Sequence, residues 1–306
     1  MPNQQTQIQD KPYFIVPFIK PKDPKEYKNL DRRFSIASGY CGVLNVTITV
    51  QTPLIFGQGD LAIQPDGVNV VHALSRENGS IALAGSSFKG ELRSFFECIT
   101  PSCVLLSKER TNCKIANGEI CPACAVFGGL GLKGKLRFSS FIAHLPVRTE
   151  YKVVPQLWSP RIDNHPGRKL YKHSKILEIG TDAIGFNYEC LPIKSELTGH
   201  IFYEGLTYEE LSALLFALGL GWEKPIYHKL GYAKPAYYGS VKIDVTDGNG
   251  GNPLSSKPQD SLETLASNYR QNADADLLQA IRVIETYWSD LNGPNQWKTV
   301  GANRVY

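Results

Sequence analysis

The chain is predicted to fold as an α+β protein with a ferredoxin-like core, on three observations. Apolar residues alternate with polar ones in several segments, a period of two that is typical of strands. Other segments carry apolar residues at spacings of three and four, which is typical of amphipathic helices. The segments follow one another as strand–helix–strand and again as strand–helix–strand, the order of a ferredoxin-like sandwich. The expected strands are 42–55, 135–142, 185–194, 198–204 and 239–245, and the expected core helices are 86–99 and 208–218.

Each core element has its own signal. The first strand alternates through Leu44, Val46, Ile48 and Val50. The first helix presents an apolar face, and Ser86 or Ser87 is expected to cap its N-terminus. The second helix begins with Thr207-Tyr208-Glu209-Glu210, which has the spacing of a capping box. These signals predict both helices with defined starts.

The remaining segments are expected to form extensions of this core and insertions into it. Residues 1–40 are rich in Pro and Lys and are interpreted as an extended arm before the domain at 41–245. Cysteine-rich residues, about 98–128, form an insertion, and the basic, aromatic stretch at about 145–176 is predicted to protrude as a loop or hairpin. Residues 246–306 begin with a Gly/Asn/Ser/Pro linker and are expected to form a helical extension, with helices at about 261–271 and 274–291.

Composition limits the class of protein. A 42% hydrophobic content is enough for a core, and mean hydropathy of −0.22 with no apolar run near eighteen residues argues against a membrane span. The N-terminus lacks the pattern of a secretory signal. We therefore expect a cytosolic protein with reduced thiols.

The distribution of charge is more informative than its sum. The net charge is +4, yet residues 85–175 contain fifteen Lys or Arg and six Asp or Glu, so this segment carries +9 and the rest −5. A basic segment in an otherwise slightly acidic protein is typical of a polyanion-binding surface. A merely solvated face is the alternative.

Five of the seven cysteines cluster between Cys98 and Cys124. Cys121-Pro-Ala-Cys124 has the spacing that places two thiolates on one tetrahedral zinc ion, and four ligands complete a structural site. Cys98 falls within the amphipathic helix, where a buried thiol is ordinary. The expected ligands are therefore Cys103, Cys113, Cys121 and Cys124, with a redox pair as the alternative.

Two further motifs are candidate anchors for phosphate. At the first helix, Ser86, Ser87, Lys89 and Arg93 combine free N–H groups with two cations on one face, although Arg93 could instead pair with Glu97. In the segment His228–Gly239, Lys229, Gly231 and Lys234 combine charge with tight turns, and tyrosines offer stacking surface. A purely structural Gly-rich turn is the alternative reading of the second motif.

Candidate catalytic carboxylates are Asp60 and Asp66, which lie in the Gly-rich loop after the first strand. Aspartates in such loops are also common turn formers. His72 lies in the same loop. No Ser-His-Asp, HExxH or paired-carboxylate helix motif is present.

Together these motifs resemble the RAMP superfamily, specifically the backbone subunits of type III CRISPR effector complexes. The resemblance spans about 42–245 and is carried by TPLIFGQG, AGSSFKGELRSFFE, CPACAVFG, GKLRFSSF and HKLGYAKPAYYGSVKI. It implies a modified RNA-recognition-type fold in the prokaryotic cytosol, with CRISPR guide RNA, complementary target RNA and other effector subunits as partners. The helix at Ser86 and the loop at Lys229–Lys234 would hold guide phosphates.

The resemblance also implies roles for other residues. The segment 145–176 would be a thumb, with Trp158, Arg161 and Tyr171 as its expected RNA contacts. Asp66 best matches the family position that cuts target RNA with magnesium or another divalent ion, and Asp60 competes with it. The family pattern is Asp-Ser-Pro, whereas this chain has Asp66-Gly67-Val68.

Three alternatives to a target-cleaving subunit stay open. The chain could be a non-catalytic scaffold of the same complex. It could be a metal-independent guide-processing endoribonuclease that uses a histidine such as His72 or His144. It could also be a zinc-containing RNA binder unrelated to CRISPR.

Overall fold

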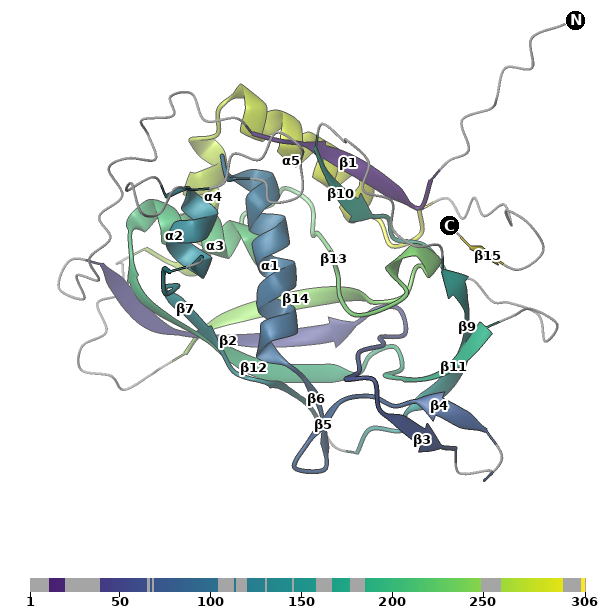
Figure 1. Ribbon diagram of the computed structural model, residues 1–306. Helices are drawn as coiled ribbons and strands as arrows, with labels where there is room; N and C mark the ends of the chain where they lie inside the picture. The colour runs from purple at the N-terminus through teal and green to yellow at the C-terminus, as the bar shows by residue number, and fades with distance from the viewer. Residues whose placement is uncertain are drawn as a thin grey trace, which may run out of the picture.

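The structure is a computed structural model that describes residues 11–19, 39–64, 67, 69–103, 113, 120–129, 131–144, 146–157, 167–176, 185–248, 260–293 and 304–305. Its centre is a curled antiparallel sheet with helices packed on one side (Figure 1). This arrangement agrees with the α+β prediction. Among the described residues, no helix is both long and apolar enough to cross a membrane.

Three long strands form the middle of the main sheet. These are β2 (Tyr40–Val50), β12 (Glu196–Leu206) and β14 (Ser240–Gly248), and β2 lies between the other two. In their register Ile48 is opposite Leu197 on one side and Ile243 on the other. The shorter strands β5 (Arg76–Glu77), β6 (Ser80–Leu83), β8 (Phe141–Ala143) and β13 (His228–Lys229) complete the order β13-β14-β2-β12-β8-β6-β5, and β7 (Leu136–Phe138) also pairs with β12.

The sheet has one apolar face and one polar face because its strands alternate. Leu44, Val46, Ile48 and Val50 are fully buried, as predicted, and face the helices. The intervening residues of β2, such as Asn45, lie on the opposite face, where His200 Nδ1 is 3.0 Å from the Asn45 Oδ1 atom. The core therefore lies between the sheet and its helices.

The two core helices are α1 (Gly85–Ile99) and α3 (Tyr208–Ala217). The predicted capping box of α3 is confirmed, because Thr207 Oγ1 accepts from the Glu210 N–H while Glu210 accepts from the Thr207 N–H. The predicted cap of α1 is wrong. Its N-cap is Ala84, which makes no side-chain bond, and Ser86 and Ser87 are exposed in the first turn.

Close backbone packing explains why α1 begins where it does. A Cβ atom at Gly85 would lie 2.4 Å from the Ser139 carbonyl oxygen, so the helix start fits tightly against the segment between β7 and β8. This contact, which requires glycine, sets the helix start in place of a serine cap.

The expected strand at 135–142 is divided into β7 and β8 by Ser139 and Ser140. The Ser139 hydroxyl donates to the Ser140 carbonyl and accepts from the His200 N–H at 2.8 Å, so this side chain joins β12 where a ladder bond would otherwise form. The two short strands still pair with β12 on the same edge.

A second sheet lies beside the first and contains one strand of the segment expected to protrude. Its strands are β3 (Leu61–Ile63), β4 (Val70–His72), β9 (Glu150–Leu157), β11 (Gly185–Cys190) and β15 (Arg304–Val305), in the order β15-β9-β11-β4-β3. Strand β10 (Gly167–Tyr171) instead pairs with β1 (Tyr13–Pro17). Strands β9 and β10 thus belong to different sheets, and part of the expected N-terminal arm is a strand.

The outer layer consists of the predicted C-terminal helices, α4 (Leu262–Gln271) and α5 (Ala275–Trp288). Helix α4 packs on α3, and α5 packs on β1 and α1. The short helix α2 (Pro122–Phe127) follows Cys121 and packs against α1. The C-terminal extension therefore belongs to the same packed body as the core.

Candidate nucleic-acid cleft and metal centre

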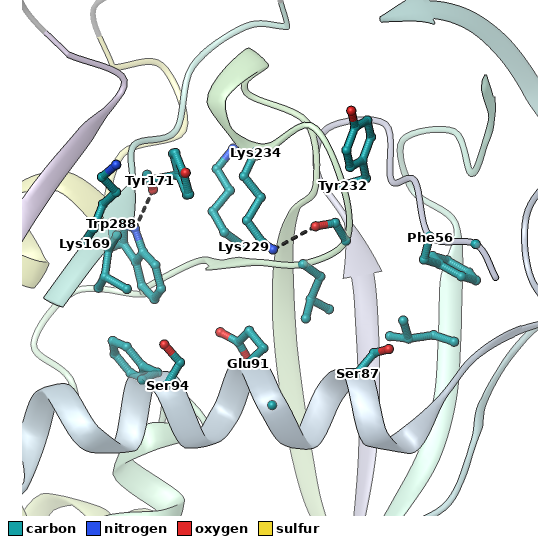
Figure 2. A pocket seen from close by; sticks show the side chains of 17 residues that line it. Phe56, Ser87, Glu91, Ser94, Lys169, Tyr171, Lys229, Tyr232, Lys234 and Trp288 are labelled. Carbon is teal, nitrogen blue, oxygen red and sulfur yellow. Dashed lines mark hydrogen bonds between the residues drawn. The ribbon is translucent and has the colours of Figure 1, made fainter. Parts of the chain in front are cut away.

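A cleft of about 560 Å³ separates α1 from the segment His228–Gly239, which we call the Gly-rich loop (Figure 2). We call this space the α1 cleft. The structure thus brings part of each predicted phosphate anchor to opposite sides of one space: Ser87 of the first, and Lys229, Gly231 and Lys234 of the second. Ser86, Lys89 and Arg93 do not line it. A third side comes from β10 and α5.

The α1 side of the cleft contains Ser87, Gly90, Glu91 and Ser94. The side chains of Ser87, Glu91 and Ser94 point from the helix toward the Gly-rich loop in Figure 2. A Cβ atom at Gly90 would meet nothing within 4 Å, so the helix surface is open there and a ligand backbone could approach it closely. Lys89 is half-buried and does not line the cleft. Burial, followed by the positive charge of Arg93, lowers its pKa.

The Gly-rich loop contains several residues with positive φ angles. Gly231 has φ +73°, and a Cβ atom there would lie 2.0 Å from the Ile55 carbonyl oxygen. Ala233 and Tyr237, which flank the 3₁₀ turn η3 (Lys234–Ala236), both have left-handed backbones at φ 57° and 66°. Such strain persists where surrounding contacts enforce it and is common at functional sites.

Two lysines, the buried Lys229 and the half-buried Lys234, donate hydrogen bonds that hold the loop in this conformation. Lys229 Nζ donates to the carbonyl oxygens of Tyr237 and Tyr238 at 3.0 and 3.2 Å. Lys234 Nζ donates to the Gly231 carbonyl oxygen at 2.7 Å. Burial lowers the pKa of both amines, for Lys229 well below its usual value. Both predicted lysines line the cleft and also brace the loop around it.

The third side of the cleft contains residues that the sequence reasoning mostly missed. Lys169 and Tyr171 come from β10, and Trp288 comes from α5. Trp288 Nε1 donates to the Tyr171 carbonyl oxygen at 2.9 Å, which fixes α5 to β10. Tyr171 was predicted as a thumb contact and lies in the cleft instead. The amphipathic pattern of α5 was a signal for burial of Trp288 but not for a place in this cleft.

Arg93 points away from the cleft, into an ion-pair network. Its guanidinium pairs with Glu97 at 2.9 Å and donates to the Gly128 carbonyl at 2.8 Å, which is the alternative that the sequence left open. Glu97 also pairs with Arg168 of β10, and Arg168 donates to the Ser94 hydroxyl. Burial, followed by the charge of Arg93, lowers the pKa of Arg168 to about 10. The network therefore joins α1 to the strand that carries Lys169.

The four predicted metal ligands lie together. The Sγ atoms of Cys103, Cys113, Cys121 and Cys124 are all within 4.8 Å of one another, and those of Cys103 and Cys124 are 3.6 Å apart. Tetrahedral thiolates around a zinc ion are about 3.8 Å apart, given Zn–S bonds of about 2.3 Å. Cys98 lies apart within α1 and donates to the Ser94 carbonyl, as expected for the surplus thiol.

Donors around the cluster suit deprotonated sulfur. The Cys121 N–H donates to the Cys113 sulfur at 3.0 Å, and Arg93 donates to the Cys124 sulfur at 3.5 Å. Hydrogen bonds among the four thiols lower the pKa of Cys121 and raise the pKa values of Cys113 and Cys124. Four such sulfurs could hold a metal ion, and they would fill a tetrahedral shell with no position left for a substrate.

The other candidate residues are separate from the cleft or lie outside the described residues. Asp60 is exposed just before β3, and its carbonyl accepts from the Ala73 N–H. His72 stacks on Tyr188 with ring centroids 4.7 Å apart. Asp66, Trp158 and Arg161 lie outside the described residues.

The fold and the cleft define an α+β protein with a groove lined by lysines, a carboxylate and aromatic side chains. The chain belongs to the RAMP superfamily, whose family model matches residues 47–242. A comparison with curated protein sequences finds no significant match.

Two solved structures have similar chains. One is a type III-B Cmr-beta complex bound to cognate target RNA, with a TM-score of 0.41 and 13% identity over 68% of this chain and 61% of that one. The other is a type IV-B CRISPR complex, with a TM-score of 0.38 and 19% identity over 76% of this chain and 99% of that one. The present chain therefore spans less than two thirds of the first structure's chain.

Proposed function

We propose that this chain is a guide-RNA-binding backbone subunit of a type III RNA-guided CRISPR effector complex, working in the cytoplasm. The observation that carries the proposal is the α1 cleft itself, where the open helix surface at Ser87 and Gly90 faces the predicted Gly-rich loop with Lys229, Gly231 and Lys234. Its partners are guide RNA, complementary target RNA and the neighbouring subunits. Membership of the RAMP superfamily supports the same assignment.

The chemistry of the cleft suits an RNA backbone. Lys169 and Lys234 lie around it, buried Lys229 braces the loop, and the Glu91 carboxylate is paired with His228. The open surface at Gly90 leaves room for phosphate and ribose. Backbone contacts of this kind are independent of sequence, as a guide that varies between complexes requires.

The core topology supports an RNA-recognition-type, ferredoxin-like fold. The chain order β2, α1, β7–β8, β12, α3, β14 gives strands in the spatial order β14-β2-β12-β8, with both helices on one face. This is the double strand–helix–strand arrangement of ferredoxin-like domains. We propose zinc as the ion of the cysteine cluster, where it would join the segment after α1 to α2.

Binding is tested with the full chain and a single-stranded guide RNA. We expect the double variant Lys169→Gln/Lys234→Gln to bind at least ten-fold more weakly than wild type. Lys242→Gln is the matched control, because Lys242 is a half-exposed lysine on the polar sheet face, paired with Asp244. Equal losses in both variants, or none in either, would contradict the proposal.

Target cleavage is a second, separable part of the proposal. Asp60 is exposed at the start of the β3–β4 hairpin, a position open to RNA and to a hydrated divalent ion. We expect Asp66→Ala to abolish one product of target RNA cleavage in magnesium while target binding survives, with Asp60→Ala compared in parallel. Survival of every product in both variants would make the chain a scaffold without catalysis.

A further inference from the structure

The second sheet has an apolar face that is only half covered. In its register Tyr188 is opposite His72, His72 is opposite Leu61, and Val70 is opposite Ile63. Because residues opposite each other, or two apart on a strand, share a face, these residues and Phe186 lie on one side of the sheet. We call this set, Leu61, Ile63, Val70, His72, Phe186 and Tyr188, the β11 face.

One half of the same side packs on the Gly-rich loop. Val154, opposite Phe186, and Cys190, two residues after Tyr188, are buried in a small core with Ala236 and Tyr238. The other half remains open: Leu61 is 63% exposed, Ile63 70%, Val70 56% and Phe186 51%. So many large apolar residues on one surface indicate a binding site.

Aromatic rings connect this face to the α1 cleft. The ring centroids of His72 and Tyr188 are 4.7 Å apart and nearly parallel, and those of Tyr188 and Tyr232 are 5.1 Å apart. Phe186 meets the edge of His72 at 6.1 Å. Tyr232 also lines the cleft and is 43% exposed. A row of four rings therefore runs from the side of the cleft to the open half of the β11 face.

We propose that the β11 face stacks unpaired nucleobases of an RNA strand whose phosphates lie in the α1 cleft. The inference rests on the function proposed above and extends it from the RNA backbone to the bases. Every nucleobase has an apolar π face, so aromatic side chains bind bases without selecting a sequence. Tyr232 carries the argument for RNA, because it belongs both to the cleft and to the row of rings.

The test compares two single-stranded RNAs that differ only in their bases. One is an ordinary oligoribonucleotide and the other is abasic at every position, so the phosphates are the same and no base remains to stack. Wild type is expected to bind the ordinary RNA more tightly. Phe186→Ala and Tyr232→Ala should each weaken that binding about five-fold or more, the loss of one stacked base, and should leave abasic RNA binding almost unchanged.

Two controls separate stacking from other effects. Phe202→Ala removes an aromatic ring of similar exposure, 36%, from the polar face of the main sheet and should change nothing. The salt dependence of binding should be the same in Phe186→Ala and wild type, because no phosphate contact is lost. Unchanged melting temperatures would show that the variants are folded.

Each contrary result overturns a defined part. Equal binding of both RNAs by wild type, or equal effects of Phe186→Ala and Phe202→Ala, would overturn the stacking face alone. Failure of wild type to bind either RNA would overturn the proposed function as well. Loss of assembly with neighbouring subunits, with RNA binding intact in Phe186→Ala, would make the face a protein contact and refute stacking.

Discussion

Replacing Glu97 by glutamine removes the negative charge on which the network between α1 and β10 depends. The Glu97 carboxylate is buried and pairs with both Arg93 and Arg168, whose side chains are themselves mostly buried. In Glu97→Gln the two guanidinium groups face each other without a counter-charge. The mutual charge effect already contributes to the lowered pKa of Arg168.

The expected cost follows from what each arginine keeps. Removing one partner of a buried ion pair costs about 3–5 kcal/mol, mainly because the other charge stays buried. Arg93 retains the Gly128 carbonyl, Arg168 retains the Ser94 hydroxyl, and glutamine retains one acceptor oxygen. We therefore expect the lower end, a loss of about 3 kcal/mol in the free energy of unfolding.

Urea unfolding followed by circular dichroism measures this loss. With a denaturant slope of about 3 kcal/mol/M, the midpoint should fall by about 1 M. The matched control is Glu204→Gln, which breaks the exposed pair with Arg137 and should cost less than about 1 kcal/mol.

A rescue experiment identifies the cause. Adding Arg168→Met to Glu97→Gln removes one of the two uncompensated charges and keeps a long apolar side chain, so the double variant should be more stable than Glu97→Gln alone. A midpoint shift no larger than that of Glu204→Gln, or a double variant less stable than Glu97→Gln, would refute the reasoning.

Three other predictions follow from the site. Gly231→Ala should lower the free energy of unfolding by about 2 kcal/mol or more and weaken RNA binding, because a Cβ atom would clash with the Ile55 carbonyl at a positive φ; wild-type behaviour in urea would contradict this. Cys121→Ser should lose the bound metal, as measured by elemental analysis, and should have a lower melting temperature; a chelator should have the same effect on wild type. Cys98→Ala is the control and should retain the metal. Metal retained in Cys121→Ser would refute the metal centre. Burial lowers the pKa of Lys229 in the folded chain, so the unfolded chain binds the extra proton, and the free energy of unfolding should rise with pH toward the unfolded lysine pKa of about 10.4. Lys229→Met should flatten that rise. Identical pH profiles of wild type and variant would refute the contribution of Lys229.

The sequence was most informative where the signal was local. The alternation in β2 and the capping box of α3 each lie within a dozen residues, and both were read correctly. The cysteine cluster was also accessible, because the Cys121–Cys124 spacing and the helical position of Cys98 together select four thiols from five.

Pairing between distant segments was harder to predict. The segment 145–176 shows little periodicity in its sequence, and its strands pair with elements outside it. Strand β9 pairs with β11, and β10 pairs with β1, which lies more than 140 residues earlier in the chain. Nothing within the segment indicates those partners. The α1 cleft has the same origin: its third side is built by β10 and by Trp288 from the C-terminal extension.

Arg93 shows why residue type alone could not settle the site. A cation on a helix next to a predicted phosphate site suits phosphate binding, yet the Arg93 guanidinium is occupied by Glu97, Gly128 and Cys124. Lys169 was not singled out, although it lies in the cleft. Which of Arg93 and Lys169 lines the cleft depends on how β10 packs against α1, and the sequence does not specify that packing.

The salt dependence of RNA binding tests the central claim most directly, that the α1 cleft holds an RNA backbone. The affinity of the full chain for a single-stranded guide RNA would be measured across salt concentrations for wild type, Lys169→Gln and Lys242→Gln. Each lost phosphate contact should reduce the slope of log affinity against log salt by about 0.7. The account predicts that reduction in Lys169→Gln and a wild-type slope in Lys242→Gln. A wild-type slope in Lys169→Gln, or the same reduction in both, would contradict it.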